Sequence, residues 1–218
     1  MWGRVAIFVT AGATLLLAWY LLAAYYNRKQ AARVLHWIEA ALAGKGEVVC
    51  LRWMGASTFH VALRLSTSAF QHPGLLVRLR PREVPPRWLL DWWRGKPATA
   101  TFEADLDVPP GFNLEVHRHR WCGRTRRHLT PHAQTWDFEP TTPLIMTSRR
   151  KWQREATGMM HALLSCRERE FLSLAFHRRS PHFAATVTLE SIFPSYSAGS
   201  NLFDMLRELA AGASTSRL

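Results

Sequence analysis

The chain has 218 residues and a net charge of +12, from 28 Lys and Arg residues against 16 Asp and Glu residues. Its hydrophobic share of 48% is that of a folded protein, and its three cysteines have no CxxC spacing. This pattern excludes a disulfide framework and the common zinc ribbons. The charge fits nucleic acid, anionic lipid or an acidic protein partner equally well, so it selects none of them.

An uncharged, apolar run extends from Val5 to Tyr26. Its 22 residues would span about 33 Å as a helix, enough for a hydrocarbon core of about 30 Å. A cleaved signal peptide is the alternative, but the run ends in the sequence AAYYN, which lacks the A-x-A pattern of a cleavage site. We therefore expect an uncleaved transmembrane anchor with its flanks over residues 1–29.

Charges beside the run predict its orientation. Arg4 precedes it, whereas Arg28, Lys29 and Arg33 follow it. The positive-inside rule places the more basic side in the cytoplasm, so we expect a single-pass protein with a cytoplasmic domain. Three cysteines without a disulfide framework agree with a reducing compartment.

The rest of the chain predicts one basic α+β domain over residues 30–211, followed by a flexible tail over 212–218. Apolar periodicity, turn residues and capping residues favour a mainly antiparallel sheet with two or three packing helices. The expected packing helices lie at 28–43, 152–169 and 201–211, and a further short helix is expected at 85–96. The expected strands lie at 47–54, 58–66, 75–80, 98–108, 112–121, 136–138, 144–146, 171–177 and 183–191.

The order helix, strand, turn, strand occurs twice, at 34–66 and at 157–190. The stretches Glu47–Phe70 and Glu170–Phe193 also have the same length of 24 residues. Two interpretations stay open, a duplicated α-β-β unit or two copies of a common local arrangement.

The strands at 98–108 and 112–121 are predicted to form a hairpin around the turn Pro109-Pro110-Gly111. Matching their apolar sides places Leu106 opposite Leu114 and Ala104 opposite Val116. A shift of one residue would put these partners on opposite faces of the sheet.

This register gathers acids and histidines on one face, with Asp105 opposite Glu115 and Glu103 opposite His117. Like charges in opposed positions are unfavourable unless something neutralises them. A divalent metal held by Asp105, Glu115, His117 and His119 would do so, as would a carboxyl with a raised pKa that serves acid–base catalysis. Arginine from a neighbouring strand is the commoner solution, and no motif confirms a site. We therefore expect no cofactor.

Three basic segments favour binding to a surface. The segment 85–96 combines tryptophan with arginine, which suits the headgroup layer of a bilayer, although tryptophans covering the sheet from the inside are the alternative. A loop after Gly123 and the expected first turn of the helix at 152–169 carry the other two groups. The predicted contacts are Arg87, Trp88, Trp92, Trp93, Arg124, Arg126, Arg127, Arg149, Arg150 and Lys151.

The sequence thus predicts a membrane-anchored, non-enzymatic accessory or assembly subunit that docks on anionic lipid headgroups or on an acidic partner. One alternative is a membrane-tethered hydrolase, metal-dependent or acid–base, that uses Glu103, Asp105, Glu115 and His117. The other is a membrane-associated nucleic-acid binder. The basic residues of this chain are scattered and form no helix-turn-helix pattern, so nucleic acid ranks last among the three kinds of partner.

Overall fold

The computed structural model describes residues 2–67, 69–110, 113–118, 136–141, 144–149 and 171–192, together with positions 203, 204, 206–208 and 210. Several predictions lie outside these residues. They are the helix at 152–169, the tail at 212–218, the metal ligand His119, and the basic contacts Arg124, Arg126, Arg127, Arg150 and Lys151.

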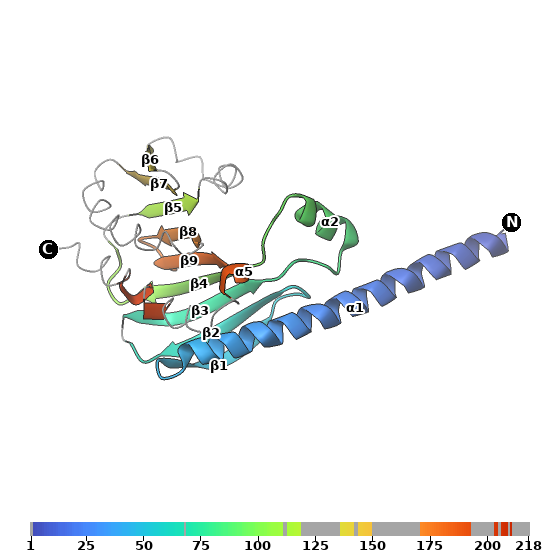
Figure 1. The fold of residues 1–218 in the computed structure, drawn as a ribbon, viewed down its shortest axis with the longest axis horizontal. Helices are drawn as coiled ribbons and strands as arrows, with labels where there is room; N and C mark the ends of the chain where they lie inside the picture. The colour runs from blue at the N-terminus through green and yellow to red at the C-terminus, as the bar shows by residue number, and fades with distance from the viewer. Residues whose placement is uncertain are drawn as a thin grey trace.

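The predicted anchor and the helix after it form one uninterrupted helix, α1 (Trp2–Leu42), of 41 residues. Its C-terminal third presents an apolar stripe at helical spacing, with Val34, Ile38 and Ala41 buried in the core. The helix ends just before Gly44, whose φ of 76° lies in the left-handed region that glycine adopts without steric cost. Figure 1 shows the C-terminal part of α1 running across strands β1 and β2, and the rest of the helix projecting far beyond the sheet.

Within the described residues, nine strands form one antiparallel sheet in the order β1-β2-β3-β4-β9-β8-β5-β7-β6. The predicted α+β class with an antiparallel sheet is confirmed. The strands are β1 (Gly46–Trp53), β2 (Thr58–Leu65), β3 (Phe70–Arg78), β4 (Thr99–Leu106), β5 (Leu114–Arg118), β6 (Trp136–Thr141), β7 (Leu144–Arg149), β8 (Phe171–Phe176) and β9 (Phe183–Thr188). Two further helices are described, α2 (Pro85–Trp93) and the short α5 (Leu189–Ile192).

The core lies between one face of the sheet and the helical residues. Alternate residues of β4 and β9 point into it, and Phe102 and Phe183 meet there edge to face, with ring centroids 6.0 Å apart. Phe203, from the helix predicted at 201–211, also packs on Phe102 at the same centroid distance. The other face of the sheet carries half-buried polar and small side chains.

Strands β4 and β5 do not form the predicted hairpin. The neighbours of β4 are β3 and β9, and those of β5 are β7 and β8. The predicted register is therefore wrong: Leu106 lies opposite Phe70 and Leu114 lies opposite Phe176. The pairs Asp105–Glu115 and Glu103–His117 are wrong for the same reason, since β9 and β8 lie between the two strands.

Loop length explains this outcome. Seven residues, 107–113, separate β4 from β5, whereas tight hairpins use two to five. Three strand spacings amount to about 14 Å, and seven extended residues reach about 23 Å, so this connection can cross two strands. The hairpin β8–β9 fills the gap because its apolar alternation matches the core face of both neighbours.

The hairpin β8–β9 confirms the predicted pairing of 171–177 with 183–191, although β9 ends at Thr188, where α5 follows. The preceding helix of the supposed repeat lies outside the described residues, so duplication stays a prediction.

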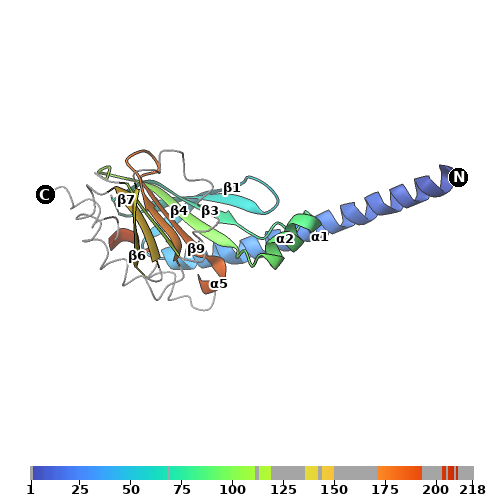
Figure 2. The ribbon, with the colours of Figure 1, turned by 90° about the horizontal axis from the view of Figure 1, so that it is seen from above.

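The two ends of the sheet are distinct. At one end of the sheet β3 ends, α2 follows and β4 begins, and we call this the α2 end. The opposite end of the sheet holds the β8–β9 turn. Figure 2 shows α2 close to α1 at the end from which α1 projects.

Candidate functional site

The apolar part of α1 leaves the domain as an exposed helix. Every described side chain from Trp2 to Leu22 is exposed, and Ala23 is the first buried one. By length and composition this helix can cross a membrane, and its most apolar stretch is 0% buried in the protein. That exposure distinguishes it from the core helix of a soluble domain.

The second half of the predicted apolar run contacts the domain along one side. Trp19 Nε1 donates a 2.8 Å hydrogen bond to the carbonyl oxygen of Arg82, and the rings of Trp19 and Trp88 lie 6.1 Å apart. The Arg82 guanidinium lies over the Tyr26 ring, 4.0 Å from its centroid. Residues 19, 23 and 26 share one helical face, so the domain covers this face where the run ends.

Asn27 closes the same junction. It is 1% exposed, and its side-chain nitrogen donates to the carbonyl of Ala56 at 3.3 Å and to the carboxylate of Glu83 at 3.2 Å. A buried amide needs such partners, since leaving it unpaired costs about 1–3 kcal/mol. The β1–β2 turn and the segment before α2 are therefore both fastened to α1.

Local sequence explains α2. Pro85 and Pro86 occupy its first two positions, where the missing N–H groups have no helical partner to lose. At the other end Gly95 adopts a φ of 59°, its N–H donates to the carbonyl of Trp92, and the N–H of Lys96 donates to that of Asp91. This is a Schellman cap, which satisfies carbonyls that helix ends otherwise leave open.

The tryptophans of α2 do not cover the sheet. Trp92 is 61% exposed and Trp93 is 80% exposed, with Leu89 and Leu90 exposed beside them. The one acid of the helix, Asp91, is buried and paired with Lys96 at 2.6 Å. Trp88 alone of the predicted aromatic contacts turns inward, toward Trp19. The α2 end of the sheet thus presents an apolar helix face bordered by the exposed Arg87 and Arg94.

Arg149 lies elsewhere. It ends strand β7, which contradicts its predicted place in the first turn of a helix. Its neighbour Ser148 pairs with Leu114, which in turn pairs with Phe176. Because these pairs belong to the end of the sheet that holds the β8–β9 turn, Arg149 and the α2 group do not lie on one patch.

The residues of the predicted acidic face lie on β4 and β5, with β9 and β8 between these two strands. Glu103 lies opposite Ala184, which lies opposite Ala175, which lies opposite Glu115. Glu103 and Glu115 are thus on the same face but three strands apart, about 14 Å. The backbone of His117 lies opposite Ser173 and Ile145, on β5. The repulsion that motivated a metal or a catalytic carboxyl does not arise between these strands.

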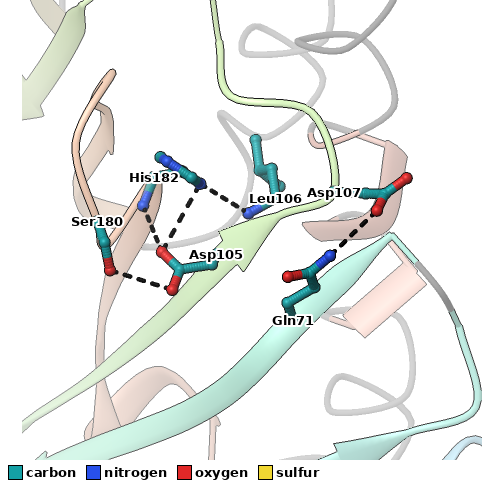
Figure 3. A network of polar contacts seen from close by, with 6 residues as sticks. All are labelled: Gln71, Asp105, Leu106, Asp107, Ser180 and His182. Carbon is teal, nitrogen blue, oxygen red and sulfur yellow. Dashed lines mark hydrogen bonds and ion pairs between the residues drawn. The ribbon is translucent and has the colours of Figure 1, made fainter.

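Asp105 instead secures the β8–β9 turn, as Figure 3 shows. Its carboxylate accepts a 3.0 Å hydrogen bond from the Ser180 hydroxyl and a 3.3 Å bond from the backbone N–H of His182. A neighbouring bond from Gln71 Nε2 to the Asp107 carboxylate, 3.1 Å long, joins β3 to the end of β4. The two bonds of Asp105 hold the β8–β9 turn to β4, a strand that is distant from it in sequence.

Asp105, His182 and Ser180 do not form a catalytic triad. The Nδ1 atom of His182 accepts a 3.2 Å hydrogen bond from the backbone N–H of Leu106, so neutral His182 carries its proton on Nε2. A triad needs Nδ1–H directed at the carboxylate and a hydroxyl on Nε2. Here Asp105 lies 3.7 Å from Nδ1, and the Ser180 hydroxyl binds Asp105. The geometry is that of a turn anchor.

Sequence reasoning missed the partners of these acids. His177 Nε2 lies 3.8 Å from the Glu115 carboxylate, and Arg178 N–H donates to the Asn113 side chain at 2.9 Å. Both join the β8–β9 turn to the start of β5. Residues 113–115 and 177–182 are more than 60 positions apart, and no local pattern connects them.

Within the described parts of the chain, no group of three or more His, Cys, Asp or Glu side chains is placed to hold a metal ion. No protein-family model matches the sequence, and no curated protein is significantly similar to it.

Proposed function

We propose that this chain is a single-pass membrane protein whose basic domain is held against the bilayer and docks on anionic lipid headgroups, as an accessory or assembly subunit rather than an enzyme. The observation that carries this proposal is the continuity of α1. One helix is exposed along its apolar N-terminal half, and its C-terminal third has one face buried in the domain core.

Contacts of the apolar run support an uncleaved anchor. Trp19 and Asn27 are packing partners of the folded domain through Arg82 and Glu83. Cleavage at Ala23 or Ala24 would remove Trp19, and the remaining part of α1 would begin inside its junction with the domain. The flanking charges favour a cytoplasmic domain.

Charge supports the choice of lipid. The domain and tail, residues 30–218, carry 25 basic against 16 acidic residues. A basic residue near an anionic surface contributes about 1 kcal/mol of attraction, which falls off within a Debye length. Because the anchor holds the domain within this range, anionic headgroups are its nearest partner. Of the predicted contacts whose side chains are described, Arg87, Trp92 and Trp93 are exposed and form the proposed docking group, whereas Trp88 packs on Trp19.

Two measurements test the proposal. The chain should stay in the membrane fraction after alkaline carbonate washing at its full 25.0 kDa mass. In vesicles, hydrogen exchange over 85–96 should be slower with phosphatidylglycerol than with phosphatidylcholine alone, and the difference should shrink in high salt. Exchange indifferent to lipid charge and salt would refute docking on anionic lipid, and slowing only after a membrane extract is added would favour a protein partner.

A matched pair of variants sharpens the second measurement. Arg87→Gln with Arg94→Gln removes two exposed charges at the α2 end, whereas Arg178→Gln with Arg179→Gln removes two exposed charges at the opposite end. We expect only the first pair to weaken the lipid-charge effect. Equal loss from both pairs would indicate a response to net charge without a docking face.

A further inference from the structure

We infer that α2 is an interfacial helix: it lies within the headgroup layer of the leaflet that α1 leaves, with Leu89, Trp92 and Trp93 among the acyl chains. The inference rests on the proposed anchor, but it concerns the depth of α2 in the membrane and the orientation of the domain. Docking on headgroups needs only charge at the surface, whereas this inference places apolar side chains below the phosphates and fixes which end of the domain stands on the membrane.

The length of α1 gives the depth. From Val5, the first residue after the charge of Arg4, to Ala18, before the first contact with the domain at Trp19, the exposed apolar helix measures about 21 Å, which is shorter than a hydrocarbon core of about 30 Å. The membrane must therefore extend past Trp19 along α1. At that level the ring of Trp88 lies 6.1 Å from the ring of Trp19, so α2 shares this depth with α1.

The exposed surface of α2 fits that environment. Leu89 is 56% exposed, and Trp92 and Trp93 are more exposed still. Tryptophan beside leucine, with Arg87 and Arg94 at the margins, is the composition of helices that lie in the membrane interface. The exposed apolar surface of α1 ends beside that of α2, so one bilayer covers both.

Backbone chemistry points the same way. Water is scarce near the acyl chains, so open N–H and C=O groups are costly there. Two prolines at the start of α2 leave fewer N–H groups open, and the cap at Gly95 engages the carbonyls of Asp91 and Trp92. The buried carboxylate of Asp91 is neutralised by Lys96.

Geometry then sets the pose of the domain. Trp19 and Asn27 hold the segment 82–88 on α1, so α2 cannot leave the membrane without breaking these bonds. The sheet stands with its α2 end toward the bilayer. Its opposite end, with the β8–β9 turn and the Asp105–Ser180 bond, faces the aqueous phase.

The test places a single fluorescent label, nitrobenzoxadiazole, at three positions of the full chain in vesicles of phosphatidylcholine and phosphatidylglycerol. Cys50, Cys122 and Cys166 are replaced by serine. The labels are attached at Val9→Cys in α1, at Leu89→Cys in α2, and at Arg179→Cys at the opposite end. Each sample is quenched by shallow or deep spin-labelled lipids, or by aqueous iodide.

At position 89 we expect a blue-shifted emission, quenching mainly by the shallow spin label, and loss of iodide quenching. The label at position 9 should be quenched best by the deep spin label. The label at position 179 should be quenched by iodide alone. Quenching of position 89 by iodide and not by lipid would overturn the inference, and so would shielding of that label from both, because a protein would then cover α2.

Failure of the anchor is separately visible, because position 9 would then show no lipid quenching. A second variant guards against an effect of the label itself. Trp92→Ser with Trp93→Ser keeps α1 and the junction intact but removes most of the exposed apolar area of α2, and we expect it to restore iodide quenching at position 89. Unchanged lipid quenching in this variant would count against burial of the two tryptophans in the membrane.

Discussion

The indole nitrogen of Trp19 donates a 2.8 Å hydrogen bond to the backbone carbonyl of Arg82, which lies 63 positions further along the chain. One end of this bond belongs to the apolar run of α1 and the other to the segment that leads into α2. The position of α2 relative to the emerging helix thus depends on a contact inside the region expected to meet lipid.

Replacing Trp19 with phenylalanine tests this contact. Trp19→Phe keeps an aromatic ring near Trp88 but removes the donor to Arg82, which should cost about 0.5–1.5 kcal/mol of stability. Hydrogen exchange over residues 82–94 should accelerate. Tyr20→Phe, on an exposed neighbouring position, is the control and should leave exchange unchanged. Equal exchange in wild type and Trp19→Phe would show that the bond does not hold α2.

The C-terminal cap of α2 depends on Gly95. Its φ of 59° is unfavourable for a residue with a Cβ, so Gly95→Ala should destabilise the cap by about 1–2 kcal/mol. Faster hydrogen exchange at the N–H groups of positions 95 and 96 would show this loss of the cap. Gly55→Ala is the matched control, because a Cβ there meets no atom within 4 Å. A similar effect from both substitutions would contradict the role of the left-handed conformation.

Asp105 is predicted to act on stability through the β8–β9 turn. Asp105→Ala removes the acceptor for Ser180 Oγ and His182 N–H, and thermal or denaturant unfolding should report a loss of about 1–3 kcal/mol. Glu103→Ala, two residues earlier on the same face, should change stability by less than about 0.5 kcal/mol. Equal losses from the two variants would contradict the assigned role of Asp105.

Cross-linking distinguishes the observed strand order from the hairpin expected between β4 and β5. The hydroxyls of Thr101 and Thr186 lie 3.1 Å apart on paired strands, so Thr101→Cys with Thr186→Cys should form a disulfide on mild oxidation. Glu103→Cys with His117→Cys, opposed only in the rejected hairpin, should not. Both pairs are made without the native cysteines and analysed by mass spectrometry. A disulfide in the second pair would overturn the strand order.

Local patterns predicted much of the fold. The uncharged run and the apolar spacing after it predicted the helix that is now seen as α1, and the alternation in 58–66 predicted β2. Such predictions succeed because helix and strand periods are properties of neighbouring residues. The start of β3 was missed because Gln71-His72-Pro73-Gly74 has the composition of a turn. In the structure these residues form a bulge within the strand, with His72 at a φ of 49°.

The sequence by itself determined the apolar run, the basic domain and the identity of most elements, because each is encoded within a few consecutive residues. Only the tertiary structure decided that β9 and β8 separate β4 from β5, which dispersed the expected acidic site, and that α2 turns its tryptophans outward beside Trp19. Several strands share the same apolar alternation, so many pairings satisfy the local pattern equally well. The choice among them is made by the burial of the whole core and by the reach of each connecting loop.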